Sequence, residues 1–410
     1  MSDFPISWVR EKFPALNQGD DFIFFDNGAG AQIPRISLDA VQNHLICRNV
    51  QRGGRYRHSV EVDETIQKAR KSVAAFLNAN SPDEIAFGMN ATSFIRIVSL
   101  AIGEVMGPRR EIVVTDLDHE ANIATWLALE KRGAEIRWWK MRDDHVLYIE
   151  DLEPLLTPRT RVVACALASN ALGSIVNIKD VSRVAHAAGA EVFVDAVHYA
   201  PHGPIDVQDL ECDYLVCSGY KIFAPHMGFL WGKAAALDAL PTFREDFIPD
   251  KAPLKIEVGT FVYENVAGMT GALDYLAELG SSGNGNQRHR LVRAMEGIRK
   301  YERMLSRALL DGIATISKAV VYGIKDTSLL HQRVPTLCFN IGNLRPETVV
   351  SRLAERNIAA RDGHMYSPRL MKRLGLLPEH GAVRASLVHY NTPQEVGKFV
   401  STLEKINADA

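Results

Sequence analysis

The chain has 410 residues, of which 47% are hydrophobic and 23% are charged, as is usual for globular proteins of more than one domain. Its 47 Lys and Arg residues are balanced by 49 Asp and Glu residues, so it lacks the strong positive field of typical nucleic-acid-binding proteins. We therefore expect no nucleic-acid partner.

No segment approaches the roughly 20 consecutive apolar residues that a membrane-spanning helix requires. The N-terminus also lacks the basic, apolar and small-residue order of a signal peptide, so we expect a cytoplasmic protein that does not contact membranes. The five cysteines are never closer than five positions apart, which favours buried thiols over a disulfide framework or a metal site.

Apolar residues between Val62 and Phe76 recur at helical spacing, ahead of a region in which β-rich runs alternate with helical patterns. Helical spacing also occurs over 122–132 and 178–188. The alternation predicts an α/β protein whose mostly parallel sheet is covered by helices on both faces. The β-rich runs are residues 111–115, 135–139, 161–169, 191–195, 213–218 and 228–232.

After about Ala267 the pattern changes to two long helices, the second over 287–310, followed by an apolar strand at 335–341. A helix near 346–356, a strand at 383–390 and a closing helix complete this part, which predicts a smaller α+β domain. We expect three parts: an N-terminal segment (1–25) packed on the small domain, a large domain (26–265) and a small C-terminal domain (266–410).

One lysine stands in an unusual place, because Lys221 lies between the apolar runs at 213–218 and 228–232. The ordinary alternative is a lysine on an exposed loop. A lysine between two buried strands loses hydration, which lowers its pKa and favours the neutral amine that forms Schiff bases.

A carboxylate occupies a matching place, because Asp195 ends the apolar run 191–195. An aspartate there is often only a helix cap, but open α/β sheets bind their ligands at the carboxyl ends of their strands. Together with Lys221 it supplies what pyridoxal 5′-phosphate requires, an amine for the aldehyde and a carboxylate for the pyridine nitrogen.

At this point the chain resembles the class V aminotransferases of the fold-type I pyridoxal phosphate enzymes, within the cysteine desulfurase-like and selenocysteine lyase-like branch. The resemblance covers nearly the whole chain. It implies a large domain with a mostly parallel sheet covered by helices and a smaller α+β C-terminal domain. The segments that carry it are FFDNGAGAQIP, DEIAFGMNATSFI, TDLDHEANIATW, ASNALGSIVNI, VDAVHYAPHGPIDV, CSGYKIFAPHMGFLWG, EVGTFVYENVAG, ARDGHMYSP and VRASLVHYNTPQEV.

The resemblance implies a role for each residue around the cofactor ring. His119 would stack on the pyridine ring, and Asn170 would hydrogen-bond the ring hydroxyl. Asp195 would pair with the ring nitrogen, and Lys221 would form the internal aldimine. A flat ring that fixes the plane of the cofactor orients the bond to be broken at Cα.

The resemblance also places the cofactor phosphate at a helix start, where free backbone N–H groups and the helix dipole favour an anion. Thr260 matches a residue that reaches the phosphate in the other subunit, which implies a homodimer with shared active sites. The residues expected at the phosphate are Asn90, Ala91, Thr92, Ser218, His198 and Tyr220.

Two arginines match substrate contacts in the family. Arg384 would hold the α-carboxylate, for which its bidentate fork is suited, although a strand-edge salt bridge is the alternative. Arg361 would be a second anion contact, and Asn27 would also lie at the substrate.

The sequence departs from the desulfurases in the loop where they carry a nucleophilic cysteine, because Tyr366 stands there. Cys338 falls in a predicted strand and is read as a core residue. We therefore expect an enzyme that acts on an amino acid through an external aldimine, with Lys221 taking the Cα proton. Elimination or replacement of a β or γ group would follow, with Tyr366 or His364 as the acid.

Two other outcomes remain open. An aminotransferase or amino-acid epimerase would use the same Lys221 chemistry and would need no acid for a leaving group. A non-catalytic scaffold with this fold is the alternative from another class, and the intact set of Lys221, Asp195, His119 and Arg384 argues against it.

Overall fold

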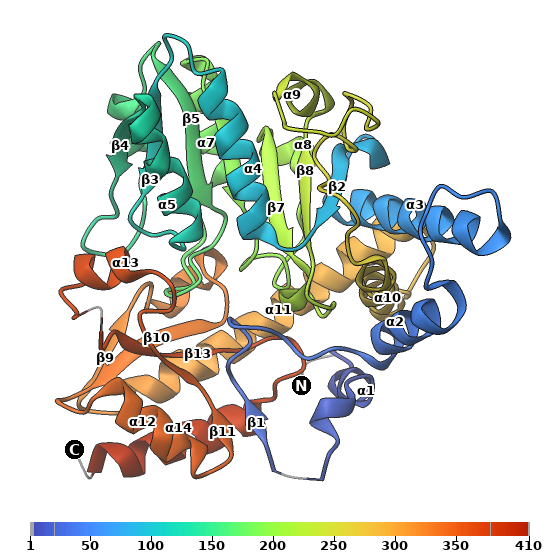
Figure 1. Cartoon of the computed structure of the whole chain (residues 1–410). Coiled ribbons are helices and arrows are strands. Elements are labelled where there is room, and N and C mark those ends of the chain that lie inside the picture. Colours follow the sequence, from blue (N-terminus) through green and yellow to red (C-terminus); the bar gives the residue numbers. More distant parts are fainter. Residues whose placement is uncertain (1–3, 20, 378, 409–410) are drawn as a thin grey trace.

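The structure is a computed structural model that describes residues 4–19, 21–377 and 379–408, and two main β-sheets organise it (Figure 1). The larger sheet has seven strands in the order β2-β8-β7-β6-β5-β3-β4. All neighbouring strands in it are parallel except β8, which runs antiparallel to β2 and β7. Its strands are β2 (Ile85–Gly88), β3 (Glu111–Thr115), β4 (Glu135–Trp139), β5 (Thr160–Ala166), β6 (Glu191–Asp195), β7 (Tyr214–Ser218) and β8 (Gly228–Gly232).

Both faces of this sheet are buried, which explains why its strands read as continuous apolar runs. In β3, Ile112 and Val114 enter one core and Val113 enters the core on the other face. The predicted α/β fold with a mostly parallel, doubly covered sheet is therefore confirmed. The first core includes α4 (Ala91–Glu104) and α5 (Ala121–Leu127), and the second includes α3 (Arg57–Leu77), α7 (Ile178–Ala187), α10 (Tyr263–Leu279) and α11 (Gln287–Ala314).

The smaller sheet is antiparallel throughout, in the order β12-β13-β10-β9. A two-stranded sheet pairs β1 (Ile23–Phe24) in parallel with β11 (Ile358–Ala359), which joins the N-terminal segment to the C-terminal part of the chain. Helix α10 packs on helices of the N-terminal half, and its Tyr275 hydroxyl bonds His389 Nε2 at 2.7 Å. The domain boundary near residue 265 stays a prediction.

The remaining elements are short or flank these sheets. The other strands are β9 (Ala319–Tyr322), β10 (Thr336–Ile341), β12 (Arg361–Gly363) and β13 (Ala382–Ser386). The other helices are α1 (Ile6–Glu11), α2 (Arg35–Arg48), α6 (Ile149–Leu152), α8 (Val207–Leu210), α9 (Ala234–Ala239), α12 (Pro346–Ala354), α13 (Pro368–Arg373) and α14 (Pro393–Ala408). Short 3₁₀ turns are η1 (Pro14–Leu16), η2 (Pro82–Glu84), η3 (Ala128–Arg132), η4 (Glu153–Leu155), η5 (Gly219–Lys221) and η6 (Thr327–Gln332).

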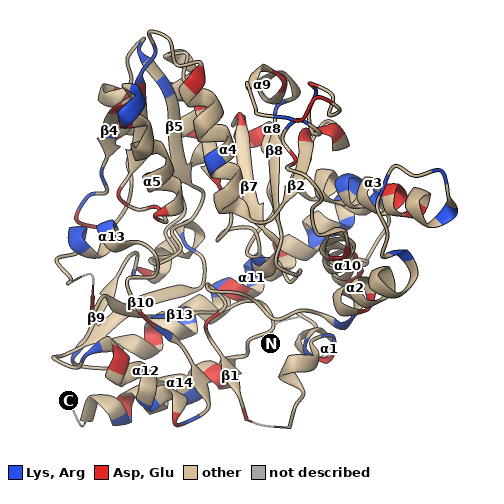
Figure 2. Ribbon diagram, viewed as in Figure 1, with Lys and Arg blue, Asp and Glu red and all other residues tan. Residues whose placement is uncertain are grey.

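Charged side chains of both signs lie on the helices and loops, as Figure 2 shows, whereas β7 and β8 contain none. Lys221, which directly follows β7 in η5, therefore stands between two uncharged strands. Within the described ranges, no helix is both long and apolar enough to cross a membrane.

One buried ion pair ties the second core to the segment that precedes α10. The guanidinium of Arg70 on α3 donates to both carboxylate oxygens of Glu257 at 2.7 and 2.8 Å, and Glu257 also accepts from the backbone N–H of Phe87 at 2.8 Å. The two side chains are 1% and 4% exposed. One carboxylate therefore connects three separate segments, namely α3, β2 and the loop at 257.

We predict that Glu257→Ala lowers the free energy of unfolding by about 3–5 kcal/mol, because it leaves Arg70 buried without its partner. Chemical denaturation followed by circular dichroism measures the change. Arg57→Ala is the control, since Arg57 is largely exposed and its pair with Glu61 is expected to contribute little, which leaves the unfolding midpoint unchanged. A Glu257→Ala protein as stable as the parent would contradict the role given to the pair.

Candidate active site

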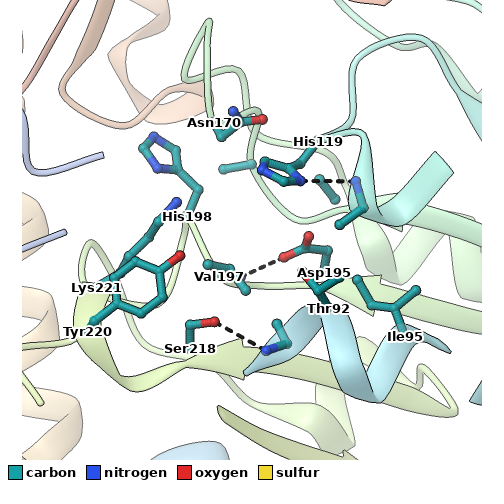
Figure 3. Close-up of a pocket in the computed structure, with 14 residues that line it drawn as sticks. Thr92, Ile95, His119, Asn170, Asp195, Val197, His198, Ser218, Tyr220 and Lys221 are labelled. Atoms are coloured by element: carbon teal, nitrogen blue, oxygen red, sulfur yellow. Dashed lines mark hydrogen bonds between the residues drawn. The ribbon is translucent and has the colours of Figure 1, made fainter. Parts of the chain in front are cut away.

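A cavity lies at the carboxyl ends of β3, β5, β6 and β7, where ligands of open α/β sheets bind (Figure 3). We call it the inner cavity. A wider groove, which we call the outer cleft, shares Thr92, His119, Asn170, Tyr220 and Lys221 with it. The inner cavity is lined by Ala91, Thr92, Ile95, His119, Ala121, Ala166, Ala168, Asn170, Asp195, Val197, His198, Ser218, Tyr220 and Lys221.

The amine of Lys221 is buried at this cavity, and the residue is only 6% exposed. Burial lowers the pKa of Lys221 to about 8, with a further lowering by the positive charge of Arg384 and an opposing effect of Asp195. An amine with that pKa is neutral in about one molecule in ten at pH 7. The structure therefore gives Lys221 the nucleophilic form that Schiff-base chemistry requires.

The carboxylate of Asp195 ends β6 and points into the inner cavity (Figure 3). Its Oδ1 accepts one hydrogen bond, from the backbone N–H of Val197 at 2.9 Å. Burial raises the pKa of Asp195, and the charge of Lys221 offsets this only in part, since no cation among the described residues forms an ion pair with Asp195. A protonated ring nitrogen placed in the cavity would supply that cation.

The imidazole of His119 follows β3 and is held in one tautomer. Its Nδ1 accepts the backbone N–H of Ala121 at 3.0 Å, which leaves the proton on Nε2. Burial and the charge of Lys221 lower the pKa of His119 to about 4, so the ring is uncharged at neutral pH. A flat, neutral ring at the wall of the cavity is suited to stacking on an aromatic ligand.

The start of α4 forms one end of the inner cavity. The Asn90 side chain caps this helix by accepting an N–H of its first turn at 2.9 Å, and Ser218 Oγ accepts the N–H of Ala91 at 3.4 Å. Gly228 on β8 permits this packing, since a Cβ there would lie 2.5 Å from the Asn90 carbonyl carbon. The hydroxyls of Thr92 and Ser218 thus accompany a helix N-terminus, which is a favourable place for a phosphate.

Asn170 and His198 lie at the other end. The amide of Asn170 bonds to the loop that follows β12, and His198 Nε2 bonds Thr336 Oγ1 at 2.9 Å. In Figure 3 the His198 ring lies on the Lys221 and Asn170 side, apart from Ser218. This placement does not favour the phosphate contact expected for His198, because the α4 end lies elsewhere in the cavity.

Two arginines from the smaller sheet reach the outer cleft, and Asp26 connects them. Arg384 donates to the Asn170 carbonyl at 2.9 Å and to Asp26 at 3.2 Å, whereas its buried Nε has no hydrogen-bond partner within the described residues. Arg361 donates to both carboxylate oxygens of Asp26, to Oδ1 at 3.1 Å and to Oδ2 at 2.9 and 2.6 Å. Arg384 therefore lines the outer cleft with one N–H that has no partner among the described residues, whereas Asp26 already occupies Arg361.

Tyr366 occupies the rim of the outer cleft and is 57% exposed. Its ring centroid lies 5.7 Å from that of His119. Tyr220 also lines both cavities, and its ring stacks on His226 at 5.1 Å. Thr260 is an exposed rim residue that accepts a hydrogen bond from Gln51 Nε2 at 2.8 Å.

Two expected site residues line neither cavity. His364 is exposed, and its Nδ1 accepts the backbone N–H of Tyr366 at 3.0 Å, so it serves the turn of this loop. Asn27 is buried, and its amide donates to the carbonyls of Phe24 and Ser386 at 3.0 and 2.8 Å. The N–H groups of the Asn27 amide are therefore already bonded, and the structure does not place Asn27 at the substrate.

The sequence analysis overlooked two acids. Asp26 has no local pattern that points to its arginines, which lie 335 and 358 residues away. Asp118 is buried between Thr115 and Asn122, and burial together with the charge of Asp195 raises the pKa of Asp118 to about 8. The only signal for Asp118 was its place beside His119.

Comparison with known proteins gives consistent results. The profile of the family described as Aminotransferase class-V matches residues 23–399. The chain belongs to the class V aminotransferase family. A protein described as "Aminotransferase-like protein FGM3" from Gibberella zeae is 35% identical over 99% of both chains, and a "Probable cysteine desulfurase" from Synechocystis is 32% identical over 97% of this chain and 94% of its own.

Solved structures agree with this assignment. The cysteine desulfurase of Thermococcus onnurineus superimposes with a TM-score of 0.89 at 25% identity, and both chains are covered completely. The cysteine desulfurase CsdA of Escherichia coli superimposes with a TM-score of 0.84 at 27% identity over 98% of each chain. The predicted resemblance to the desulfurase-like branch is thereby confirmed.

Enzymes of this family use pyridoxal 5′-phosphate, and the inner cavity fits it. The cavity combines a buried amine with a lowered pKa, a buried carboxylate that lacks a cation, a neutral imidazole and a helix start with two hydroxyls. We propose that Lys221 holds the aldehyde carbon, Asp195 the ring nitrogen, His119 the ring face, and Thr92 and Ser218 the phosphate. When bound, this cofactor withdraws electrons from the Cα of an amino acid.

We predict that the rate at which cofactor-free protein takes up pyridoxal 5′-phosphate rises with pH and levels off above about 8. The reactive species is the neutral amine of Lys221, and its lowered pKa means that protonation blocks the reaction only below that pH. Stopped-flow absorbance measures the rate. Borohydride reduction and peptide mapping should label Lys221 rather than Lys255, a buried lysine that is paired with Asp250. Labelling of Lys255, or a rate still rising at pH 10, would refute the assignment.

Proposed function

We propose that the chain is a pyridoxal 5′-phosphate-dependent lyase that removes a β or γ group from an amino acid without a cysteine nucleophile. A carbon–sulfur bond or a related bond is the one that breaks. The single observation that carries the proposal is that Tyr366, and no cysteine of the described residues, stands at the entrance to the cavity that holds Lys221.

The placement of the five cysteines supports this. Cys165, Cys212, Cys217 and Cys338 have no exposed surface, and burial raises the pKa of each thiol. Cys47 is exposed on α2 but lines neither cavity. A thiolate that accepts sulfur must be both ionised and accessible to the substrate, and none of the five combines these properties at the site.

Three other residues at the site have separate roles in this reaction. The free N–H of Arg384 holds the α-carboxylate, and the neutral amine of Lys221 takes the proton from Cα. The bond to the leaving group then breaks with its electron pair on the leaving atom, while a double bond forms in the remaining fragment. The hydroxyl of Tyr366 donates the proton that the leaving atom needs.

Transamination is the second candidate, favoured by the relative described as aminotransferase-like, with which the chain shares 35% identity. It uses the same amine and arginine but retains the side chain of the substrate. A panel of amino acids in deuterated water, with products identified by mass, distinguishes the two. A lyase releases a side-chain fragment, whereas an aminotransferase yields an intact keto acid.

We further propose a homodimer whose subunits meet at the outer cleft. Its rim exposes apolar side chains, since Met89 is 61%, Val258 is 71% and Tyr366 is 57% exposed. Such a rim around a polar site is typical of a surface that another chain covers. Thr260 lies at the same rim and would then face the site of the partner.

We predict that single Cys→Ala variants at all five cysteines retain turnover within about tenfold, a barrier change of roughly 1.4 kcal/mol. The reason is that no thiol takes part in the reaction. Steady-state rates with the best substrate of the panel measure it. An inactive variant that still folds and binds the cofactor, or a persulfide mapped to any of the five, would restore a desulfurase mechanism.

We predict that Tyr366→Phe lowers kcat by 10²- to 10⁴-fold, the usual contribution of a general acid. KM should change little, because the ring remains at the rim. The matched control is Tyr148→Phe, a half-buried tyrosine whose hydroxyl bonds Asp144 and which lies outside both cavities. A normal rate in Tyr366→Phe would remove this residue from the mechanism.

For the dimer, we predict that sedimentation equilibrium gives twice the 45.5 kDa mass of one chain. Val258→Asp should shift the equilibrium towards the monomer, because it puts a charge into the apolar rim. A monomer with full activity would disprove shared active sites.

A further inference from the structure

A row of buried polar side chains extends from the inner cavity into the protein. His198 Nε2 bonds Thr336 Oγ1 at 2.9 Å, and His202 Nδ1 bonds Glu302 Oε2 at 2.8 Å. The rings of His198 and His202 lie with centroids 5.6 Å apart and planes at 69°. None of these four residues is more than 4% exposed. The row begins at Lys221, because Lys221 and His198 line the same cavity (Figure 3).

The members of the row are held uncharged. Burial lowers the pKa of His198 well below its usual value and that of His202 to about 3, and the charge of Lys221 adds to both shifts. Burial raises the pKa of Glu302 well above its usual value. A neutral imidazole carries one N–H and one acceptor nitrogen, so it can receive a proton on one side while it releases another.

The row ends at a second, small cavity lined by His202, which has room for little more than one water molecule. Glu302 and His202 both line it, and Glu302 Oε1 is buried without a hydrogen-bond partner in the part of the chain that the structure describes. Buried polar atoms are nearly always bonded, and a water in a polar cavity is the usual partner. The other polar residues that line it are Tyr199, Arg299, Arg303, Ser306, His331 and Arg333.

A structural tie is the simpler explanation for the pair of His202 and Glu302, since it joins the segment after β6 to α11. A tie alone does not explain why the buried Glu302 lines a cavity. Nor does it explain why a second imidazole, that of His198, continues the row towards Lys221. Three buried titratable groups are also costly compared with an apolar core.

We propose that His198, His202 and Glu302 conduct protons between Lys221 and the water of the second cavity. The inference rests on the proposed function only in taking Lys221 as the group that gains the substrate proton. His202 and Glu302 touch no reacting atom and act through His198.

The transfer conserves charge at each step. The ammonium of Lys221 gives a proton to His198, His198 passes one to His202, and His202 passes one to Glu302, which releases its own proton to water. Lys221 ends as the neutral amine, the positive charge leaves as hydronium in the second cavity, and His198, His202 and Glu302 end neutral, as they began. A rotation of one ring is needed between the histidines, because their planes are nearly perpendicular.

Other charged groups surround the row and set the field in which it works. Arg384 on β13 and Lys221 act on His198, and His389 and Lys221 act on His202. Around Glu302 and the second cavity the charged or titratable groups are Tyr199, Arg299, Arg303, His331 and Arg333, and the backbone of His389 also contacts Glu302.

The test uses the holoenzyme in a pH jump, with the visible absorbance of the bound cofactor reporting protonation at the Lys221 nitrogen. We expect Glu302→Gln to slow this relaxation at least tenfold, because the amide keeps the bond to His202 but cannot release a proton. His202→Asn should have the same effect. Ser306→Ala, which alters the same cavity outside the row, should relax within twofold of the parent.

Two controls separate the possible failures. Equal thermal midpoints and equal equilibrium spectra show that the variants fold and bind the cofactor. Relaxation of Glu302→Gln and His202→Asn within twofold of the parent would overturn the proton path. A parent protein without any visible band from Lys221 would overturn the proposed function itself.

Discussion

The removal of the Lys221 amine from water is the constraint on which the rest of the site depends. It is imposed by the sheet, because β7 and β8 are uncharged, buried strands that run antiparallel on either side of the short segment containing Lys221. Desolvation lowers the pKa of the amine, and Arg384 lowers it further. The nearest counter-charge, Asp195, is itself desolvated and has a raised pKa, so it does not restore the ammonium form fully.

The same constraint explains the composition of the surrounding walls. A buried amine and a buried carboxylate without a direct partner are costly, and such groups are concentrated where a protein binds a ligand that compensates them. His119, His198 and His202 are neutral chiefly because they are buried, and the positive charge of Lys221 lowers the pKa of each ring further. The cavity is therefore prepared for an anionic, aromatic ligand by the residues that it contains.

Much of the central architecture is predictable from the sequence, because strands buried on both faces leave long apolar runs such as 111–115 and 213–218. Lys221 and Asp195 stand out for the same reason, as isolated charges at the ends of those runs. Contacts between distant segments leave no such trace. The pairing of Asp26 with Arg361 joins residues 335 positions apart. The Asn27 amide likewise donates to β13, a strand from the far end of the chain. Chain order alone could not reveal either.

Lys221 and Arg384, the two side chains that we propose act on the amino acid, belong to different sheets. The amine of Lys221 is fixed by the seven-stranded sheet, whereas Arg384 belongs to β13 of the four-stranded sheet. In the proposed function, the packing between the two sheets would therefore set the distance between Lys221 and the arginine that holds the substrate carboxylate. Core substitutions beneath β13, remote from both cavities, are then expected to appear in KM before they appear in stability, and steady-state kinetics beside thermal melts would reveal them.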